Sequence, residues 1–328
     1  NAALNLAQAT KNGYYASKTL SNMAWLYEQT GNYELAEQCY TKALHIPNAN
    51  LKDLDLLASH NSIGAINYKQ GEYDKAIVHY LKALAISDSL GNAMTSSICM
   101  NNIGGVFYRL GNMGKALHYF EKSLEIKREA GDQFGIASSL NNIASVLLEN
   151  SDTLKALDYF KQSLKIREEV GDLPGTAASL NNIGTVYRQM NRNEEAIALY
   201  HKSVALKEQM GDRAGLTVTL NNIAIAYREM ELFSQAIEYA LRSLVLAREI
   251  RSYDDIKIGH ETTAQIYGLI GDYEKAYEHH KDYVRIKDSL FSIEKSTQIE
   301  ELERKYNTDQ KEKELEIEKA ENAIKDAE

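Results

Sequence analysis

The chain has 328 residues, of which 44% are hydrophobic and 25% are charged, values that are ordinary for a folded protein. Its formal net charge of −9 argues against a protein that mainly coats nucleic acid or an anionic membrane, because both need a basic surface. Only 2 prolines occur, and the sequence holds no apolar run of about 18 residues that could span a bilayer. We therefore expect long helices joined by short turns, with no nucleic-acid binding and no direct membrane insertion by this fragment.

The chain starts at Asn1 without an initiator Met or a signal peptide, so we expect a piece of a longer protein. Leu4 lies forty residues before Leu44, which occupies a recurring position described below. Residues 1–13 are accordingly expected to be the end of a preceding helix.

The sequence repeats itself every forty residues. A small residue, a leucine-like residue and an aromatic residue each recur with this period. The invariant alanines are Ala36, Ala76, Ala116, Ala156, Ala196, Ala236 and Ala276, and the aromatic column holds Tyr40, Tyr80, Phe120, Phe160 and Tyr200 before Ala240 and His280 interrupt it. A fixed period of this size indicates a helical solenoid.

Each repeat is predicted to contain two helices. In residues 176–210, apolar side chains recur at spacings of three and four along two segments, which are separated by a polar turn at Met190–Asn193. Other repeats place a glycine in this turn, as at Gly31 and Gly71, where a left-handed backbone can end a helix. Seven repeats are expected, at residues 14–50, 51–90, 91–130, 131–170, 171–210, 211–250 and 251–290.

The joints between repeats carry a Gly-Asp pair, for example Gly131-Asp132 and Gly171-Asp172. The glycine can end one helix and the aspartate can cap the next one.

Residues 291–328 differ from the repeats, because they are rich in charge and contain no Gly or Pro. Ile299, Leu302 and Tyr306 form a short apolar stripe that is offset from a second stripe at Ile317 and Ile324. We expect a charged helix, either single or paired in a coiled coil whose register shifts between the stripes. In the coiled-coil alternative, two copies of the chain form a homodimer through this helix.

The order of a small residue, a tyrosine three later, a glycine and then an alanine with an aromatic four later resembles the tetratricopeptide (TPR) repeat. The resemblance covers about residues 14–290 and implies an all-α, right-handed α-solenoid of about seven helix pairs with a C-terminal charged helix. The phrase Ser-Leu-Asn-Asn-Ile-Gly/Ala, at Ser139–Ala144 and Ser179–Gly184, is similar to TPR segments of bacterial sensor histidine kinases and LuxR-type regulators, especially those of Bacteroidetes-like lineages.

In TPR proteins the first helix of each pair lines the concave groove, so the resemblance assigns a double asparagine column to that groove. Its members are Asn101, Asn102, Asn141, Asn142, Asn181, Asn182, Asn221 and Asn222. Asparagine is a poor helix former, and a side-chain amide offers a donor and an acceptor that suit a peptide backbone. The alternative is that one asparagine of each pair bonds the backbone of a neighbouring helix and fixes the repeat spacing. The two interpretations are compatible, and we favour the second asparagine as the groove member.

One turn further along the same helices lie Tyr68 and Tyr108, then Arg188 and Arg228. If they face the groove, its first half is aromatic and its second half offers guanidinium groups that pair with carboxylates. The alternative is that these are ordinary surface or inter-repeat residues.

No catalytic motif, phosphate loop, cofactor box or metal-ligand spacing is recognisable, so we expect no enzyme, cofactor or metal in this fragment. Cys39 and Cys99 are expected to be buried apolar residues. The adjacent His279 and His280 are expected at the surface, and Gly104-Gly105 is interpreted as helix packing.

The sequence thus predicts a module that binds a protein or an extended peptide, most similar to the sensory segment of a bacterial signal-transduction protein. A plain scaffold for multiprotein assembly and a Rap-type response-regulator-binding protein are the alternatives. Two unpaired cysteines favour a reducing compartment, whereas the sensor resemblance favours the periplasm, so the compartment stays open.

Overall fold

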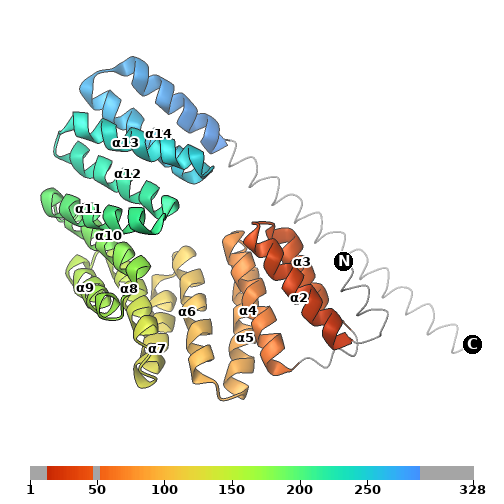
Figure 1. The fold of residues 1–328 in the computed structure, drawn as a ribbon. Helices are drawn as coiled ribbons and strands as arrows, with labels where there is room; N and C mark the ends of the chain where they lie inside the picture. The colour runs from red at the N-terminus through yellow and green to blue at the C-terminus, as the bar shows by residue number, and fades with distance from the viewer. Residues whose placement is uncertain (1–12, 47–51, 289–328) are drawn as a thin grey trace, which may run out of the picture. The chain divides into compact units, whose positions relative to one another are not determined.

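The computed structural model describes residues 13–46 and 52–288, and these residues are helical apart from short turns (Figure 1). The expected end of a preceding helix at residues 1–13 lies almost wholly outside this part of the chain. The charged helix at residues 291–328, with its coiled coil and homodimer, lies entirely outside it. None of the described helices is both long and apolar enough to cross a membrane.

The chain divides into two compact units between Glu195 and Ala196. The helices of the first unit are α2 Gly13–Gln29, α3 Tyr33–Leu44, α4 Asp53–Lys69, α5 Tyr73–Ser89, α6 Ala93–Arg109, α7 Met113–Glu129, α8 Gln133–Glu149, α9 Thr153–Glu169 and α10 Leu173–Gln189. Helix α11, Asn193–Met210, crosses the division, and the second unit continues with α12 Arg213–Glu229, α13 Phe233–Glu249, α14 Tyr253–Ile270 and a helical segment at residues 273–288. The prediction of an all-α array of repeated helix pairs is confirmed, and no strand occurs in the described residues.

Within each unit, a helix packs against the one that follows it, and consecutive helices start twenty residues apart. The recurring alanines are fully buried where two helices of a pair meet, as Ala76 and Ala116 show with 0% exposure, except that Ala276 is only half-buried. The aromatic column packs beside them, with Tyr80 and Phe120 each 3% exposed. The small residues therefore let helices approach, and the rings fill the space that remains.

Buried serines form hydrogen bonds between the two helices of a pair, and these bonds recur from repeat to repeat. In the first unit, the hydroxyl groups of Ser123 and Ser163 each donate to a main-chain carbonyl 26 residues earlier, at 2.8 Å. In the second unit, Ser243 donates to the carbonyl of Thr217 at 2.9 Å. Each bond joins the second helix of a pair to the first.

The turns follow the predicted chemistry. Gly31, Gly71 and Gly111 have φ values of +75°, +81° and +73°, in the left-handed region that glycine tolerates. In the glycine-free turn at 190–193, α10 ends at Gln189 and Asn191 takes φ +59°, which asparagine accepts more readily than most residues.

The Gly-Asp joints cap the following helix as predicted. The carboxylates of Asp132 and Asp172 accept a hydrogen bond from the main-chain N–H of Gly135 and of Gly175, at 3.0 and 2.9 Å. A buried cation stands behind each cap, Lys127 at 4% exposure and Arg167 at 8%. A main-chain turn, a capping carboxylate and a buried cation therefore form one recurring joint between repeats.

Candidate functional site

The asparagine column forms a ladder of side-chain hydrogen bonds in the first unit. The Nδ2 group of Asn142 on α8 donates to Oδ1 of Asn101 on α6, and Asn182 donates in the same way to Asn141, each at 3.0 Å. The ladder extends one repeat earlier, where Asn102 donates to Asn61 at 3.0 Å. Each step joins the second asparagine of one first helix to the first asparagine of the preceding one.

This geometry differs from the expectation that one asparagine of each pair bonds the backbone of a neighbouring helix. The partner is another amide, because residues 41 apart face each other when helices start every forty residues. The ladder nevertheless links successive first helices, as that interpretation required.

The ladder leaves polar groups open. Within the described part of the chain, Nδ2 of Asn101 and of Asn141 has no hydrogen-bond partner, and neither does Oδ1 of Asn102 and of Asn142. An amide carries two N–H donors and two acceptor positions on its oxygen, so every step retains a donor and an acceptor. All four residues are half-buried and reachable from solvent.

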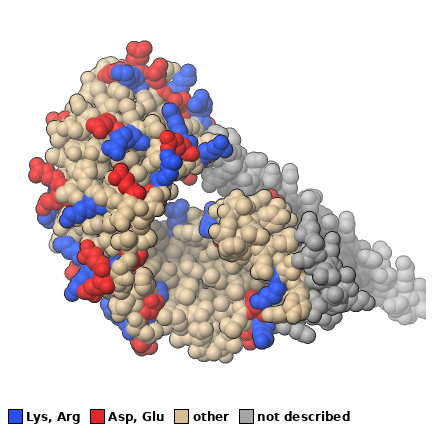
Figure 2. Space-filling model, viewed as in Figure 1, with Lys and Arg blue, Asp and Glu red and all other residues tan. Residues whose placement is uncertain are grey.

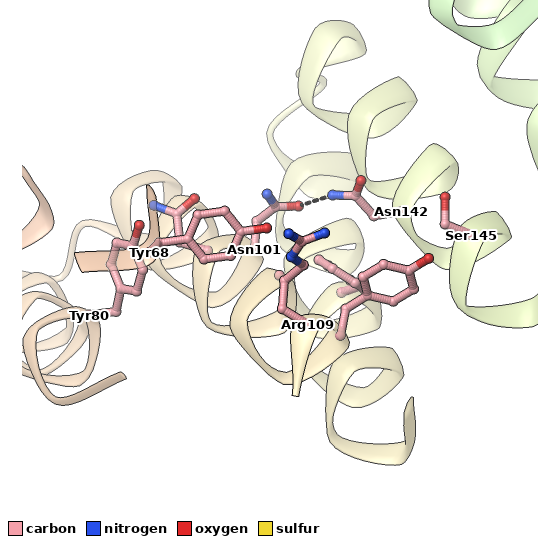
Figure 3. A pocket seen from close by; sticks show the side chains of 10 residues that line it. Tyr68, Tyr80, Asn101, Arg109, Asn142 and Ser145 are labelled. Carbon is pink, nitrogen blue, oxygen red and sulfur yellow. Dashed lines mark hydrogen bonds between the residues drawn. The ribbon is translucent and has the colours of Figure 1, made fainter. Parts of the chain in front are cut away.

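A cavity of about 370 Å³ lies beside the ladder in the first unit (Figure 3). Its walls come mostly from the first helices α4, α6 and α8, with two rings from α5 and α7. The lining residues are Tyr68, Tyr80, Asn101, Asn102, Gly105, Tyr108, Arg109, Phe120, Asn142 and Ser145. Five of the predicted site residues thus meet here: Tyr68, Tyr108, Asn101, Asn102 and Asn142.

Both asparagines of α6 line this cavity, so the preference for the second asparagine as the groove member does not describe α6. The other predicted residues do not line the cavity. Asn221 on α12 is only 7% exposed, which leaves little of its amide open to a ligand, and Asn222 beside it is half-buried.

The two predicted arginines occupy separate units. Arg188 lies half-buried on α10, and Arg228 on α12 donates a hydrogen bond to the side chain of Gln265 on α14. Arg109 is the guanidinium group that borders the cavity, and it was not among the predicted site residues. Its signal was its place directly after Tyr108, since adjacent positions near a helix end can both reach the same hollow.

The tyrosines of the cavity are weak acids here. Burial raises the pKa of Tyr68 and of Tyr108, and the carboxylate of Glu149 raises that of Tyr108 further. The Tyr108 hydroxyl donates to Glu149 at 3.4 Å. These hydroxyl groups therefore stay protonated and act as hydrogen-bonding groups and apolar surface.

Two histidine pairs were not predicted. Nδ1 of His60 on α4 lies 3.1 Å from Nδ1 of His79 on α5, and Nδ1 of His260 on α14 lies 3.2 Å from Nδ1 of His279. His279 is half-buried in this pair, so the expectation that it is a surface residue is wrong. Within the described residues, no group of three or more metal-ligating side chains occurs, and each pair is a helix-to-helix contact.

Charged side chains on the visible face are mixed in sign. Figure 2 shows Lys and Arg interspersed with Asp and Glu over the described residues of that face, without one broad region of a single sign.

The repeated helix pairs with small residues at their contacts define an all-α helical-repeat protein. Models of the tetratricopeptide repeat family match residues 17–46, 55–129, 135–209 and 216–255. The chain belongs to the tetratricopeptide repeat family, whose fold is a protein-interaction scaffold. No curated protein sequence matches it significantly.

Solved structures share this fold at low sequence identity. Aspartyl phosphate phosphatase F from Bacillus subtilis aligns with 14% identity and a TM-score of 0.71, over 87% of this chain and 74% of that one. The Rap conjugation gene regulator of plasmid pLS20, in complex with the Phr* peptide, aligns with 19% identity and a TM-score of 0.66, over 85% and 75%. A signal transduction ATPase with a tetratricopeptide repeat sensor from Pyrococcus horikoshii aligns with 20% identity and a TM-score of 0.63, over 87% and 45%.

Proposed function

We propose that this chain binds an extended peptide along the asparagine ladder of its first helices. The observation that carries the proposal is the repeated pair of unused amide groups, a donor on the first asparagine and an acceptor on the second. A peptide main chain offers the complementary pair at every residue. Recognition of this kind depends little on side chains, so the ladder supplies general affinity.

The spacing of the ladder suits an extended chain. Packed helices lie roughly 8 to 10 Å apart, and an extended peptide advances about 3.3 Å per residue. One step of the ladder therefore corresponds to roughly three peptide residues. Ordered amides also lose little freedom on binding, because each is already held by its neighbour.

We further propose that the setting is the sensory or interaction segment of a bacterial signal-transduction protein. The similarity of the Ser-Leu-Asn-Asn phrases to sensor kinases supports this setting, and so does the fold shared with a peptide-bound Rap regulator and with the sensor of an ATPase. A plain scaffold and a Rap-type response-regulator-binding protein remain the alternatives. Kinase activity, in this proposal, belongs to a module outside the fragment.

A displayed library of random dodecapeptides tests the ladder. Peptides selected on the wild-type chain are titrated against the double variant Asn102→Ala with Asn142→Ala, and we expect at least a tenfold loss of affinity. Gln162→Ala removes an exposed amide from the second helix α9 and serves as the matched control. Unchanged affinity in the double variant would refute the ladder.

The same selected peptides separate a sensor from a scaffold. A sensor should transmit binding, so saturating peptide is expected to change amide hydrogen exchange in α12 to α14 as well as in α4 to α8. Protection confined to the ladder helices favours the scaffold.

A further inference from the structure

Two adjacent glycines on α6 have different surroundings. A Cβ atom on Gly104 would lie 2.7 Å from ring carbons of Phe120, so Gly104 is needed for packing. A Cβ atom on Gly105 would meet nothing within 4 Å. The interpretation of both glycines as helix packing therefore holds for Gly104 and is wrong for Gly105.

Gly105 opens the cavity. The same position of the other first helices carries Trp25, Ala65, Ser145, Thr185, Ile225 and Gln265, so the repeat accepts side chains of many sizes there. A glycine inside a helix costs about 1 kcal/mol relative to alanine, and the open space around a Cβ at position 105 shows that no neighbouring atom excludes a side chain there. What the missing side chain provides is space between the ladder and the rings beneath it.

The floor and walls of this space are aromatic. Phe120 and Tyr80 are almost fully buried and are held against α6 and α4 by the close approach at Gly104 and Gly64. Tyr68 and Tyr108 also line this space, and both are half-buried. Rings arranged in this way bind apolar and aromatic groups through their faces and edges.

A single cation borders the aromatic space. The Nε group of Arg109 donates to the hydroxyl of Tyr73 at 3.2 Å, which orients the guanidinium group. Within the described residues Arg109 has no carboxylate partner, so its remaining N–H donors are available. Figure 3 shows Tyr68, Asn101, Arg109 and Asn142 directed toward one space.

We propose that this cavity is a specificity pocket for one large apolar or aromatic side chain that is next to a carboxylate in a peptide. This inference rests on the proposed peptide-binding function. It adds a preference for particular peptide side chains, which the ladder does not supply because it contacts the main chain. The rings take the side chain, Arg109 pairs with the carboxylate, and the amides of Asn101 and Asn142 hold the main chain between them. A volume of about 370 Å³ is at the small end of ligand pockets, which suits one residue rather than a folded partner.

Short blocked peptides test the pocket without the rest of the ladder. Acetyl-Phe-Glu-amide, acetyl-Phe-Gln-amide, acetyl-Ala-Glu-amide and acetyl-phenylalanine are titrated into the protein with isotope-labelled tyrosine, and ring signals are followed by NMR. We expect acetyl-Phe-Glu-amide to shift the signals of Tyr68 and Tyr108 and to bind at least tenfold tighter than the Gln and Ala analogues. Acetyl-phenylalanine reports whether a terminal carboxylate replaces the acidic side chain.

Two variants complete the experiment. Gly105→Ile places in α6 the residue that α12 carries at this position, and it is expected to abolish the shifts while thermal unfolding shows a folded chain. Gly105→Ala should weaken binding partially, and Arg109→Gln should remove the preference for Glu over Gln.

The experiments distinguish failure of the pocket proposal from failure of the ladder proposal. Equal binding of all probes, or wild-type binding by Gly105→Ile, overturns the pocket whatever the library peptides do. Dipeptide binding at the pocket combined with ladder variants that bind library peptides normally overturns the ladder alone. If no peptide of either kind binds, both proposals are wrong.

Discussion

At the scale of single residues, the three Gly-Asp joints between repeats depend on Gly135, Gly175 and Gly215, which no larger residue can replace without movement. A Cβ atom on Gly175 would lie 1.9 Å from Oδ2 of the capping Asp172 and 2.7 Å from Cδ of the buried Arg167. Arg167 in turn donates to the carbonyl of Gly175 at 2.6 Å and to the hydroxyl of Ser179 at 3.0 Å. Asp172, Arg167 and Gly175 are therefore packed so closely that no space is left for a side chain at position 175.

We predict that Gly175→Ala destabilises the protein by about 1 to 3 kcal/mol, since either the cap or the hydrogen bonds of a buried cation must be given up. Gly105→Ala is the matched control, because its Cβ is unopposed and alanine is the better helix former, so it should stabilise by about 0.5 to 1 kcal/mol. Urea unfolding midpoints measure both. Equal effects of the two substitutions would contradict this account of the joint.

At the scale of helices, the histidine pairs join the two helices of a repeat through neutral rings. Burial, then the charges of His60 and Lys82, lower the pKa of His79 to about 4. Burial also lowers the pKa of His260 to about 4, although Asp282 opposes the shift. Arg248 can only donate to Nε2 of His260, at 3.2 Å, so Nδ1 of His260 carries the hydrogen that faces His279.

These pairs predict a loss of stability in acid. The unfolded chain binds protons on histidine below its ordinary pKa of about 6.5, whereas His79 and His260 of the folded chain stay neutral until about pH 4, and burial also lowers the pKa of their partners His60 and His279. Stability contributed by the pairs is therefore fully present above about pH 6.5 and falls as the pH drops toward 4. His60 and His79 are only half-buried. We therefore expect their pair to contribute about 1 kcal/mol to the free energy of unfolding, which is less than a fully buried pair would contribute.

The measurement is the difference in unfolding midpoint between pH 7.5 and 5.0. His79→Gln should reduce this difference, because glutamine can still accept a hydrogen bond but does not titrate. His118→Gln, which changes an exposed ring on α7, should leave it unchanged. The same acid sensitivity in all three proteins would show that the pairs do not cause it.

The helices themselves could be predicted from the sequence, since apolar spacing and turn residues set their ends, as at the Gly-Asp joints. The hydrogen-bond partners of individual side chains were harder to predict. Asn101 and Asn142 lie 41 apart, one more than the period, so reading single columns missed their bond. The histidine pairs join positions 19 apart on two helices, although their recurrence 200 residues later was a usable signal. The cavity at Gly105 exists because this residue has no side chain, and the spacing of apolar residues does not predict such a space.

At the scale of the whole molecule, contacts are local along the chain. The hydrogen bonds described between helices join residues no more than 41 apart, so each helix is stabilised by its neighbours. Stability in such arrays is approximately a sum over repeats and the interfaces between adjacent ones.

We therefore predict that Ser243→Ala acts locally. Loss of its buried bond to the carbonyl of Thr217 should cost about 1 kcal/mol. Amide hydrogen exchange should accelerate in α12 and α13, while amides of α4 and α5 keep their wild-type rates. A uniform acceleration along the chain would instead indicate one cooperative unit.

The joint between repeats has a consequence for how such a chain can change in length. Excision of residues 132–171 would fuse Gly131 directly to Asp172, and this junction would again hold a glycine, a capping aspartate and Gly175 three residues later. Lys127 would take the place of Arg167, and Asn101 would face Asn182. Recombination at these joints can thus add or remove whole repeats while keeping the same kind of junction, so a gene lineage can change the number of ladder steps.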